Sequence, residues 1–197
     1  MDKTIQEKYI AEFEELLQST EREGVENLIQ WIREETDFYS APASTKGHGS
    51  FEGGLLVHSL SVYRLLGNFS KNIKEVNPAS VVIVGLLHDL CKVNFYIKTV
   101  RNVKIPGERR WEEVQGYGIE DSLPLGHGEK SVYMAMKHID LTDEEAMAIR
   151  WHMSGYDDAA RGYVGGMAQS AAYRMYPLAA AAAIADMYDT YIIDAMN

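Results

Sequence analysis

Cysteine is nearly absent from this sequence of 197 residues, which contains only Cys91. A single cysteine excludes an internal disulfide framework and a zinc site built from four cysteines. Long apolar runs are also missing, because the longest, Val81–Leu87 and Leu178–Ala185, are far shorter than the roughly 18 residues of a membrane span. The N-terminal stretch MDKTIQEKYIAEFEELL is too polar and acidic for a signal peptide. We therefore expect a soluble cytoplasmic protein that does not enter the membrane.

Positive charge is also in short supply. Lys and Arg number 19 against 29 Asp and Glu, so the formal net charge is −10. Such a chain repels a phosphate backbone at long range, which disfavours nucleic acid as a partner unless basic residues gather locally. A small anionic substrate is compatible with this charge, because a bound metal ion can reverse the local field. The apolar fraction of 46% is ordinary for a folded domain of this length.

Apolar residues recur mostly at helical spacing, which predicts an all-α protein. One stretch is different, because residues 95–119 alternate apolar and polar side chains around a turn, a pattern typical of a β-hairpin. Loops are expected over residues 38–54 and 154–166, which are rich in glycine and small polar residues. Helices are expected at about residues 4–17, 55–68, 79–93, 128–139, 143–153 and 177–193. A further helix, capped by Ser19 or Thr20, is expected to contain Val25, Leu28, Ile29 and Ile32.

Several ionisable residues lie where these helices should be buried. His58 shares a helical face with three leucine or valine residues one and two turns away. His88 and Asp89 end the apolar run VVIVGLLHDL, and Asp186 lies within the run LAAAAAIADMYDTYI. His152 follows apolar residues on its own helix. Four separate helices therefore carry histidine or aspartate on the side that should face the core.

The cost of burial indicates what these residues do. A buried carboxylate costs several kcal/mol unless it is paired or bound to metal. A hydrogen bond to a backbone carbonyl would satisfy each histidine taken alone, but it would leave Asp89 and Asp186 without partners. Lys and Arg are scarce on these faces. A divalent metal satisfies the whole set, since neutral imidazoles and carboxylates are ligands for Zn, Mn and Fe.

The order of these residues resembles the HD-domain metal-dependent phosphohydrolase superfamily. The segments GGLLVHS at His58 and LLHDLCK at His88 carry most of the resemblance. GHGEKS at His127 and WHMSGYD at His152 are similar to the two additional histidines of its two-metal members. The resemblance covers about residues 45–190 and implies an all-α HD-type helical bundle, here with a small β-hairpin inserted.

The resemblance also implies a set of metal ligands. One metal would be held by His58, His88, Asp89 and Asp186, and a second by His127 and His152 with Asp89 bridging both. We expect one or two divalent transition metals, and Mn, Fe, Co, Ni and Zn all accept such ligands. The family often has glycine where this chain has Cys91, and we do not assign Cys91 as a ligand.

Two further residues are candidates for contact with substrate. By the resemblance, Lys92 would point at a substrate phosphate and stabilise charge that develops on phosphoryl oxygen, while Asp89 would also place the attacking water. The alternative for Lys92 is a surface lysine near a helix end. His48 lies in a loop before the first ligand and would contact a phosphate or protonate the leaving group. The alternative for His48 is an exposed loop histidine.

We interpret the whole chain as one HD-type domain, because the sequence shows no linker and no repeat. Its parts would be N-terminal helices over residues 1–40, a metal-binding core over residues 45–193, and the hairpin insert over residues 95–119. The insert gathers basic residues that either guide an anionic substrate or are simply solvated. These are Lys98, Arg101, Lys104, Arg109 and Arg110.

The function expected from these residues is metal-dependent hydrolysis of a phosphoester, with a nucleotide or another small phosphorylated molecule as the substrate. Three alternatives stay open. The resemblance around residues 45–60 is nearest to the 3′–5′ exoribonuclease-like branch, which would act on nucleic acid ends. Some proteins of similar fold use two irons for oxygenation, and a non-catalytic, metal-stabilised binding module is the remaining alternative. The sequence does not indicate an oligomeric state.

Overall fold

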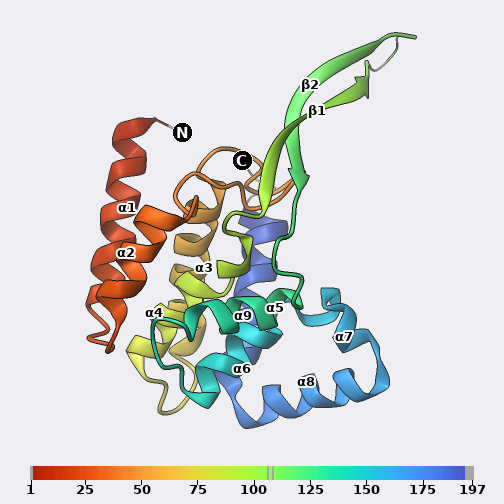
Figure 1. Cartoon of the computed structure of the whole chain (residues 1–197). Coiled ribbons are helices and arrows are strands. Elements are labelled where there is room, and N and C mark those ends of the chain that lie inside the picture. The colour runs from red at the N-terminus through yellow and green to blue at the C-terminus, as the bar shows by residue number, and fades with distance from the viewer. Residues whose placement is uncertain (1, 106, 108, 194–197) are drawn as a thin grey trace.

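A computed structural model describes residues 2–105, 107 and 109–193 of the chain. It is a helical bundle from which one β-hairpin projects, as the sequence predicts (Figure 1). The α-helices are α1 (Lys3–Gln18), α2 (Val25–Glu35), α3 (Gly54–Ser70), α4 (Pro78–Leu87), α5 (His127–Ala135), α6 (Asp143–Trp151), α7 (Asp158–Arg161), α8 (Tyr163–Met175) and α9 (Pro177–Tyr188). Three short helical segments lie directly after α4, α6 and α9. They are the 3₁₀ turns η1 (Leu90–Lys92) and η2 (Ser154–Tyr156) and the π-helix η3 (Asp189–Ile193).

Local sequence signals fix the start of two helices that carry site residues. α4 begins with Pro78 at its first position, and the Asn77 side chain accepts a hydrogen bond from the backbone of Ala79 at 2.9 Å. α6 begins with a capping box, in which Thr142 and Glu145 each accept a hydrogen bond from the other's backbone. Both starts lie where the sequence predicts them.

The core consists of two apolar clusters that share α3 and α4. The first packs α1 and α2 against these helices, with Phe13, Leu17, Leu28 and Ile83 among its buried members. The second packs α6 and α9 against the other side of α3 and α4. Because apolar side chains pack against α3 and α4 on both sides, these two helices hold the residues that they carry between the two halves of the core.

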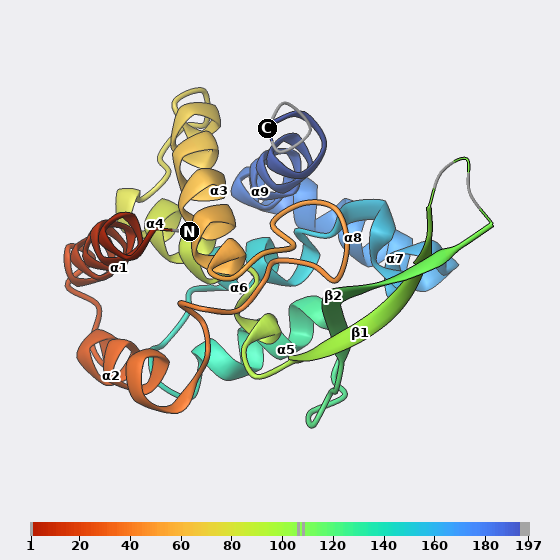
Figure 2. The ribbon, with the colours of Figure 1, turned by 90° about the horizontal axis from the view of Figure 1, so that it is seen from above.

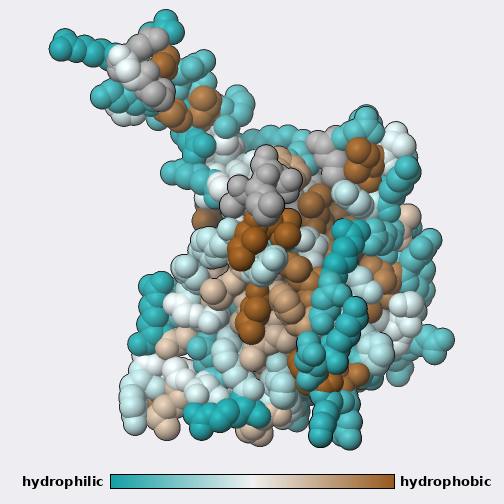
Figure 3. Space-filling view, turned by 180° about the vertical axis from the view of Figure 1, so that it is seen from behind, coloured by the Kyte–Doolittle hydropathy of each residue, from teal (hydrophilic) through white to brown (hydrophobic). Residues whose placement is uncertain are grey.

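The hairpin consists of β1 (Tyr96–Lys104) and β2 (Trp111–Ile119). The strands pair in antiparallel register from Tyr96 opposite Ile119 to Lys104 opposite Trp111. The hairpin stands clear of the helices, and most of its side chains are exposed (Figures 2 and 3). Its base joins the bundle directly after η1, so it begins beside the residues expected to bind metal.

Several helical boundaries differ from the prediction. α2 begins at Val25 instead of after Ser19 or Thr20, because Gly24 before it has a left-handed backbone with φ 86°. α5 ends at Ala135 instead of near residue 139, because residues 136–138 form a turn. α4 ends at Leu87 instead of near residue 93, because Asp89 turns the backbone out of the helix with φ −102° and ψ 21°. The expected loop over residues 154–166 contains α7 and the start of α8, where Asp157 caps α7 through the backbone N–H of Ala159 at 2.8 Å. α9 ends at Tyr188 and continues as the π-helix η3. In the part of the chain that the structure describes, no helix has the length and apolar character needed to cross a bilayer.

Candidate metal centre

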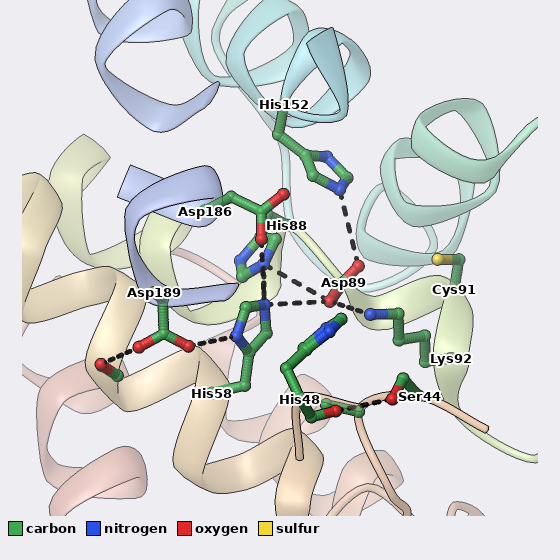
Figure 4. A network of polar contacts seen from close by, with 12 residues as sticks. Ser44, His48, His58, His88, Asp89, Cys91, Lys92, His152, Asp186 and Asp189 are labelled. Atoms are coloured by element: carbon green, nitrogen blue, oxygen red, sulfur yellow. Dashed lines mark hydrogen bonds and ion pairs between the residues drawn. The ribbon is translucent and has the colours of Figure 1, made fainter. Parts of the chain in front are cut away.

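Five helices bring their histidines and aspartates to one place in the bundle. Figure 4 shows those carried by α3, by α9 and by the ends of α4 and α6. Asp89, just after α4, contacts residues from three other elements there. The structure thus brings together all six residues that the sequence predicts as ligands, from α3, the end of α4, the start of α5, the end of α6 and α9: His58, His88, Asp89, His127, His152 and Asp186.

Two glycines allow the helices to approach closely enough for this convergence. A Cβ atom at Gly85 of α4 would lie 2.6 Å from the Cα atom of Tyr63 in α3. A Cβ atom at Gly128 of α5 would lie 2.1 Å from the carbonyl oxygen of Arg150 in α6. Both contacts are shorter than a real Cβ atom tolerates, so only glycine permits these two helix pairs to pack as they do. The first contact brings His58 and His88 together, and the second brings His127 and His152 together.

The outer ring nitrogens of three histidines are held in hydrogen bonds. Nδ1 of His88 lies 3.0 Å from the carbonyl oxygen of Gly85, and Nδ1 of His152 lies 2.7 Å from that of Ile149. A carbonyl oxygen only accepts, so each Nδ1 donates, and each neutral ring keeps a lone pair on Nε2. Nδ1 of His58 lies 2.7 Å from a carboxylate oxygen of Asp189. The three Nε2 atoms are therefore presented to the interior of the cluster.

Those lone pairs face other acceptors. Nε2 of His88 lies 3.5 Å from Oδ2 of Asp89, and Nε2 of His152 lies 3.5 Å from Oδ1 of the same carboxylate. Nε2 of His58 lies 3.1 Å from Nε2 of His88. Nε2 of His152 is fully buried and has no hydrogen-bond partner among the described residues. Acceptor atoms that face one another across a buried space need either a proton or a metal cation between them. The donor set therefore fits a divalent metal.

The pKa shifts in the cluster also show that its carboxylates favour positive charge beside them. Burial lowers the pKa of His58, but hydrogen bonds to Asp186, Asp189 and Asp89 outweigh burial and raise it well above its ordinary value. Burial raises the pKa of Asp89, but Lys92 and the neighbouring histidines outweigh burial and hold it well below its ordinary value. Burial also raises the pKa of the half-buried Asp186, but the hydrogen bond from His58 outweighs burial and lowers it. Asp89 and Asp186 are thus carboxylates, which are the form that binds metal.

The donor atoms fall into three overlapping groups, in each of which the atoms lie within 4.8 Å of one another. The groups are His58 with His88 and Asp186, His88 with Asp89 and His152, and Asp89 with Cys91 and His127. The sulfur of Cys91 lies 3.3 Å from Nδ1 and 3.5 Å from Nε2 of His127. A sulfur almost equidistant from both nitrogens contacts the ring instead of pointing along one lone pair, so we leave Cys91 out of the ligand set.

Lys92 and His48 lie beside the cluster. Nζ of Lys92 donates a hydrogen bond to Asp89 at 2.6 Å, although the side chain is almost completely buried. Burial lowers the pKa of Lys92 and the Asp89 carboxylate raises it above its ordinary value, so Lys92 is a cation. The His48 ring lies 5.4 Å from that of His58. Burial and the charge of Lys92 lower the pKa of His48, so at neutral pH it is an uncharged ring.

A cavity of about 250 Å³ opens next to these groups. Its lining includes the polar side chains of His48, Lys92, His127 and Asp186. Apolar and aromatic side chains from the hairpin base, η2, the end of α9 and η3 complete it. This cavity gives a small molecule access to the candidate metal centre.

A comparison with protein families agrees with this geometry. The family model described as HD domain matches residues 55–191, which is more than half of the chain and contains all six candidate ligands. The chain belongs to the HD-domain family. HD domains bind divalent metals, and the family is typically one of metal-dependent phosphohydrolases. No curated protein and no solved structure matches the chain significantly.

Within this HD domain, two functional candidates escape sequence reasoning. Asp189 is buried and holds His58, and Ser61 donates a hydrogen bond to the other oxygen of Asp189. The available signal is spacing, because Asp189 follows Asp186 by three residues and Ser61 follows His58 by three, which places each pair on one helical face. The remaining histidine, His138, stacks on Trp31 and belongs to none of the donor groups found in the described part of the chain.

Proposed function

We propose that this HD-domain protein hydrolyses a phosphoester of a nucleotide or another small phosphorylated molecule, with one or two divalent transition metals at the cluster. The observation that carries the proposal is the set of buried acceptors that face one another beside a cavity lined by a cationic lysine. A bound divalent metal supplies neutralisation of phosphate charge and lowers the pKa of water to near 7.

The residues of the cluster would divide this work. His58, His88, Asp89 and Asp186 would hold one metal, and His127 and His152 would hold a second that shares Asp89. Asp89 is suited to bridge because its two oxygens face different partners: one lies 2.8 Å from Nε2 of His127 and the other 3.3 Å from Nε2 of His58. Asp89 would also orient the attacking water by accepting a hydrogen bond from it.

Lys92 and His48 would act on the substrate. Lys92 holds its charge in a buried place and points toward the cluster, so it would stabilise negative charge that develops on the phosphoryl oxygens. His48 is uncharged at neutral pH, so its ring N–H would donate a hydrogen bond to the phosphate or to the leaving oxygen. A neutral imidazole does not protonate a leaving group as an imidazolium does. The low pKa of His48 thus favours a binding role over that of a general acid.

The size of the cavity supports a small substrate. A volume of about 250 Å³ accommodates a phosphoryl group and the part of the molecule attached to it. The net charge of −10 disfavours a long polyanion. The resemblance of residues 45–60 to the exoribonuclease-like branch makes a nucleic acid 3′ end the second candidate substrate.

A hydrolysis panel tests this proposal. Protein loaded with Mn²⁺ is incubated with nucleoside monophosphates, cyclic nucleotides, sugar phosphates and short oligonucleotides, and released phosphate or product is measured by chromatography. We expect turnover of at least one small phosphoester, abolished by a chelator and restored by added metal. Cleavage of oligonucleotides alone would replace the small substrate by the nucleic acid end. Oxygen consumption by iron-loaded protein, without phosphoester cleavage, would contradict hydrolysis.

A further inference from the structure

We propose that Asp189 is a positioning residue that fixes the His58 ring for metal binding and is not itself a ligand. This inference rests on the metal centre of the proposed function. It concerns a second, outer carboxylate three residues after Asp186, whose role differs from that of Asp186 because it contacts the opposite edge of the same ring.

The contacts of His58 separate the two carboxylates. Oδ1 of Asp186 lies 3.2 Å from Nε2, the nitrogen that faces the cluster. Oδ2 of Asp189 lies 2.7 Å from Nδ1, the nitrogen that faces away from it. Asp186 belongs to a donor group that could hold a metal, whereas Asp189 belongs to none of the groups found among the described residues. Asp189 therefore reaches the candidate metal only through the imidazole of His58.

The Asp189 carboxylate is itself held in place. Its exposed fraction is 5%, and that of His58 is 3%. The hydroxyl of Ser61 donates a hydrogen bond to Oδ1 of Asp189. A buried carboxylate with both oxygens occupied cannot rotate away from the ring, so the direction of the His58 Nδ1–H bond is fixed.

Two helical segments provide this arrangement by matching spacings. His58 and Ser61 lie one turn apart on α3, and Asp186 and Asp189 lie one turn apart where α9 passes into the π-helix η3. The start of η3 coincides with Asp189, and such helical irregularities are frequent at functional sites. The change in helix type sets Asp189 against the outer edge of the ring while Asp186 faces the inner edge.

The consequence for metal binding follows from the position of the proton. A histidine that binds metal is neutral, and with Nδ1–H donated to Asp189 the neutral His58 ring has its lone pair on Nε2, as His88 and His152 do. His88 and His152 are oriented by backbone carbonyls, which no substitution removes cleanly. His58 is the member of this trio held by a side chain, and the negative charge of that side chain makes the ring a stronger donor to metal.

The test measures zinc affinity by competition with a chromophoric chelator. We expect Asp189→Ala to bind Zn²⁺ about 10- to 100-fold more weakly than the wild type, as is usual when the partner of a ligating histidine is lost. Asp189→Asn keeps an acceptor oxygen for Nδ1–H and is expected to recover part of the affinity. Ser61→Ala should produce a smaller loss than Asp189→Ala. Asp158→Asn, whose side chain is 94% exposed, is the matched control and should bind as the wild type does.

A second readout separates positioning from a purely structural role. In zinc-loaded protein with ¹⁵N-labelled histidine, the Nδ1–H signal of His58 should be present and slow to exchange in the wild type and in Asp189→Asn. In Asp189→Ala the same proton should exchange rapidly, because its acceptor is gone. A general loosening of the fold would change all buried histidine signals together, including those of His88 and His152.

The possible results distinguish this inference from the proposed function. Wild-type affinity in a folded Asp189→Ala protein would overturn the positioning role while leaving the metal centre intact. Failure of the wild type to bind any divalent metal would overturn the metal centre, and this inference with it. If Asp189→Ala does not fold, Asp189→Asn and Ser61→Ala decide, and unchanged zinc affinity and unchanged Nδ1–H exchange in both would overturn the proposal.

Discussion

Replacement of Asp89 by asparagine is expected to reduce phosphoester hydrolysis by about 10³-fold or more. Asp89 is the residue on which the cluster converges, since its carboxylate lies within 3.5 Å of ring nitrogens from four histidines and also accepts from Lys92. Asparagine preserves the size of the side chain but removes its negative charge. The substitution therefore deprives both candidate metals of a shared anionic ligand and leaves the buried charge of Lys92 uncompensated.

The measurement is the turnover of the substrate found in the hydrolysis panel, with wild type and variant at equal metal concentration. Excess metal should recover little of the activity, because the lost group also orients the attacking water. The matched control is Glu52→Gln, an exposed carboxylate that pairs with Lys98 outside the cluster, and its turnover should equal that of the wild type. Retention of more than about a tenth of the activity by Asp89→Asn would show that Asp89 is not at the centre of catalysis.

Replacement of Glu145 by alanine is expected to reduce the free energy of unfolding by about 3 kcal/mol. Glu145 is completely buried and accepts two hydrogen bonds from Arg22, at 2.7 and 2.9 Å. It also accepts from the Ser80 hydroxyl and from the backbone of Thr142. A single carboxylate thus connects the segment before α2, the start of α4 and the start of α6. Alanine would leave these donors without a partner.

Thermal unfolding of the metal-free protein checks this expectation, and the midpoint should fall by about 6–12 °C for a domain of this size. Glu145→Gln keeps the shape of the side chain and one of its two acceptor oxygens, so its loss of unfolding free energy should be smaller than that of Glu145→Ala. Burial raises the pKa of Glu145, but Arg22 and Ser80 outweigh burial and hold it below its ordinary value. The carboxylate therefore stabilises the fold fully at pH values above the unfolded-state pKa of glutamate. The difference in unfolding midpoint between wild type and Glu145→Ala should shrink as the pH falls from that pKa through the lower pKa of Glu145 in the folded protein. A midpoint unchanged at neutral pH would contradict the role of this ion pair.

The sequence predicts much of this fold because local signals and burial agree. Asn77 and Pro78 mark the start of α4, Thr142 marks the start of α6, and strict alternation marks the two strands of the hairpin. The helix α8 is different, because the glycines that precede and begin it favour a loop by propensity. Its formation depends on packing against neighbouring helices, which a single segment does not reveal.

The sequence also predicts which histidines and aspartates gather at the candidate site, but it misses Asp189 and Ser61. His58, His88 and Asp186 can be predicted because each interrupts an apolar helical face, where burying an ionisable residue is costly unless it is paired or binds metal. Asp189 follows at the end of the last helix among tyrosines and other polar residues, so it reads as an ordinary exposed carboxylate. Its burial depends on the change from α9 to the π-helix η3 and on contact with α3, both of which are tertiary features.

Metal analysis of the purified protein tests the central claim most directly. Wild type and a His88→Ala/Asp89→Ala double variant are loaded with the same divalent transition metal, freed of excess by gel filtration and analysed by inductively coupled plasma mass spectrometry, with circular dichroism to confirm that both are folded. We expect about one to two equivalents of metal per wild-type chain and essentially none in the folded double variant. Equal metal content in the two proteins would contradict the assignment of this cluster as the metal centre.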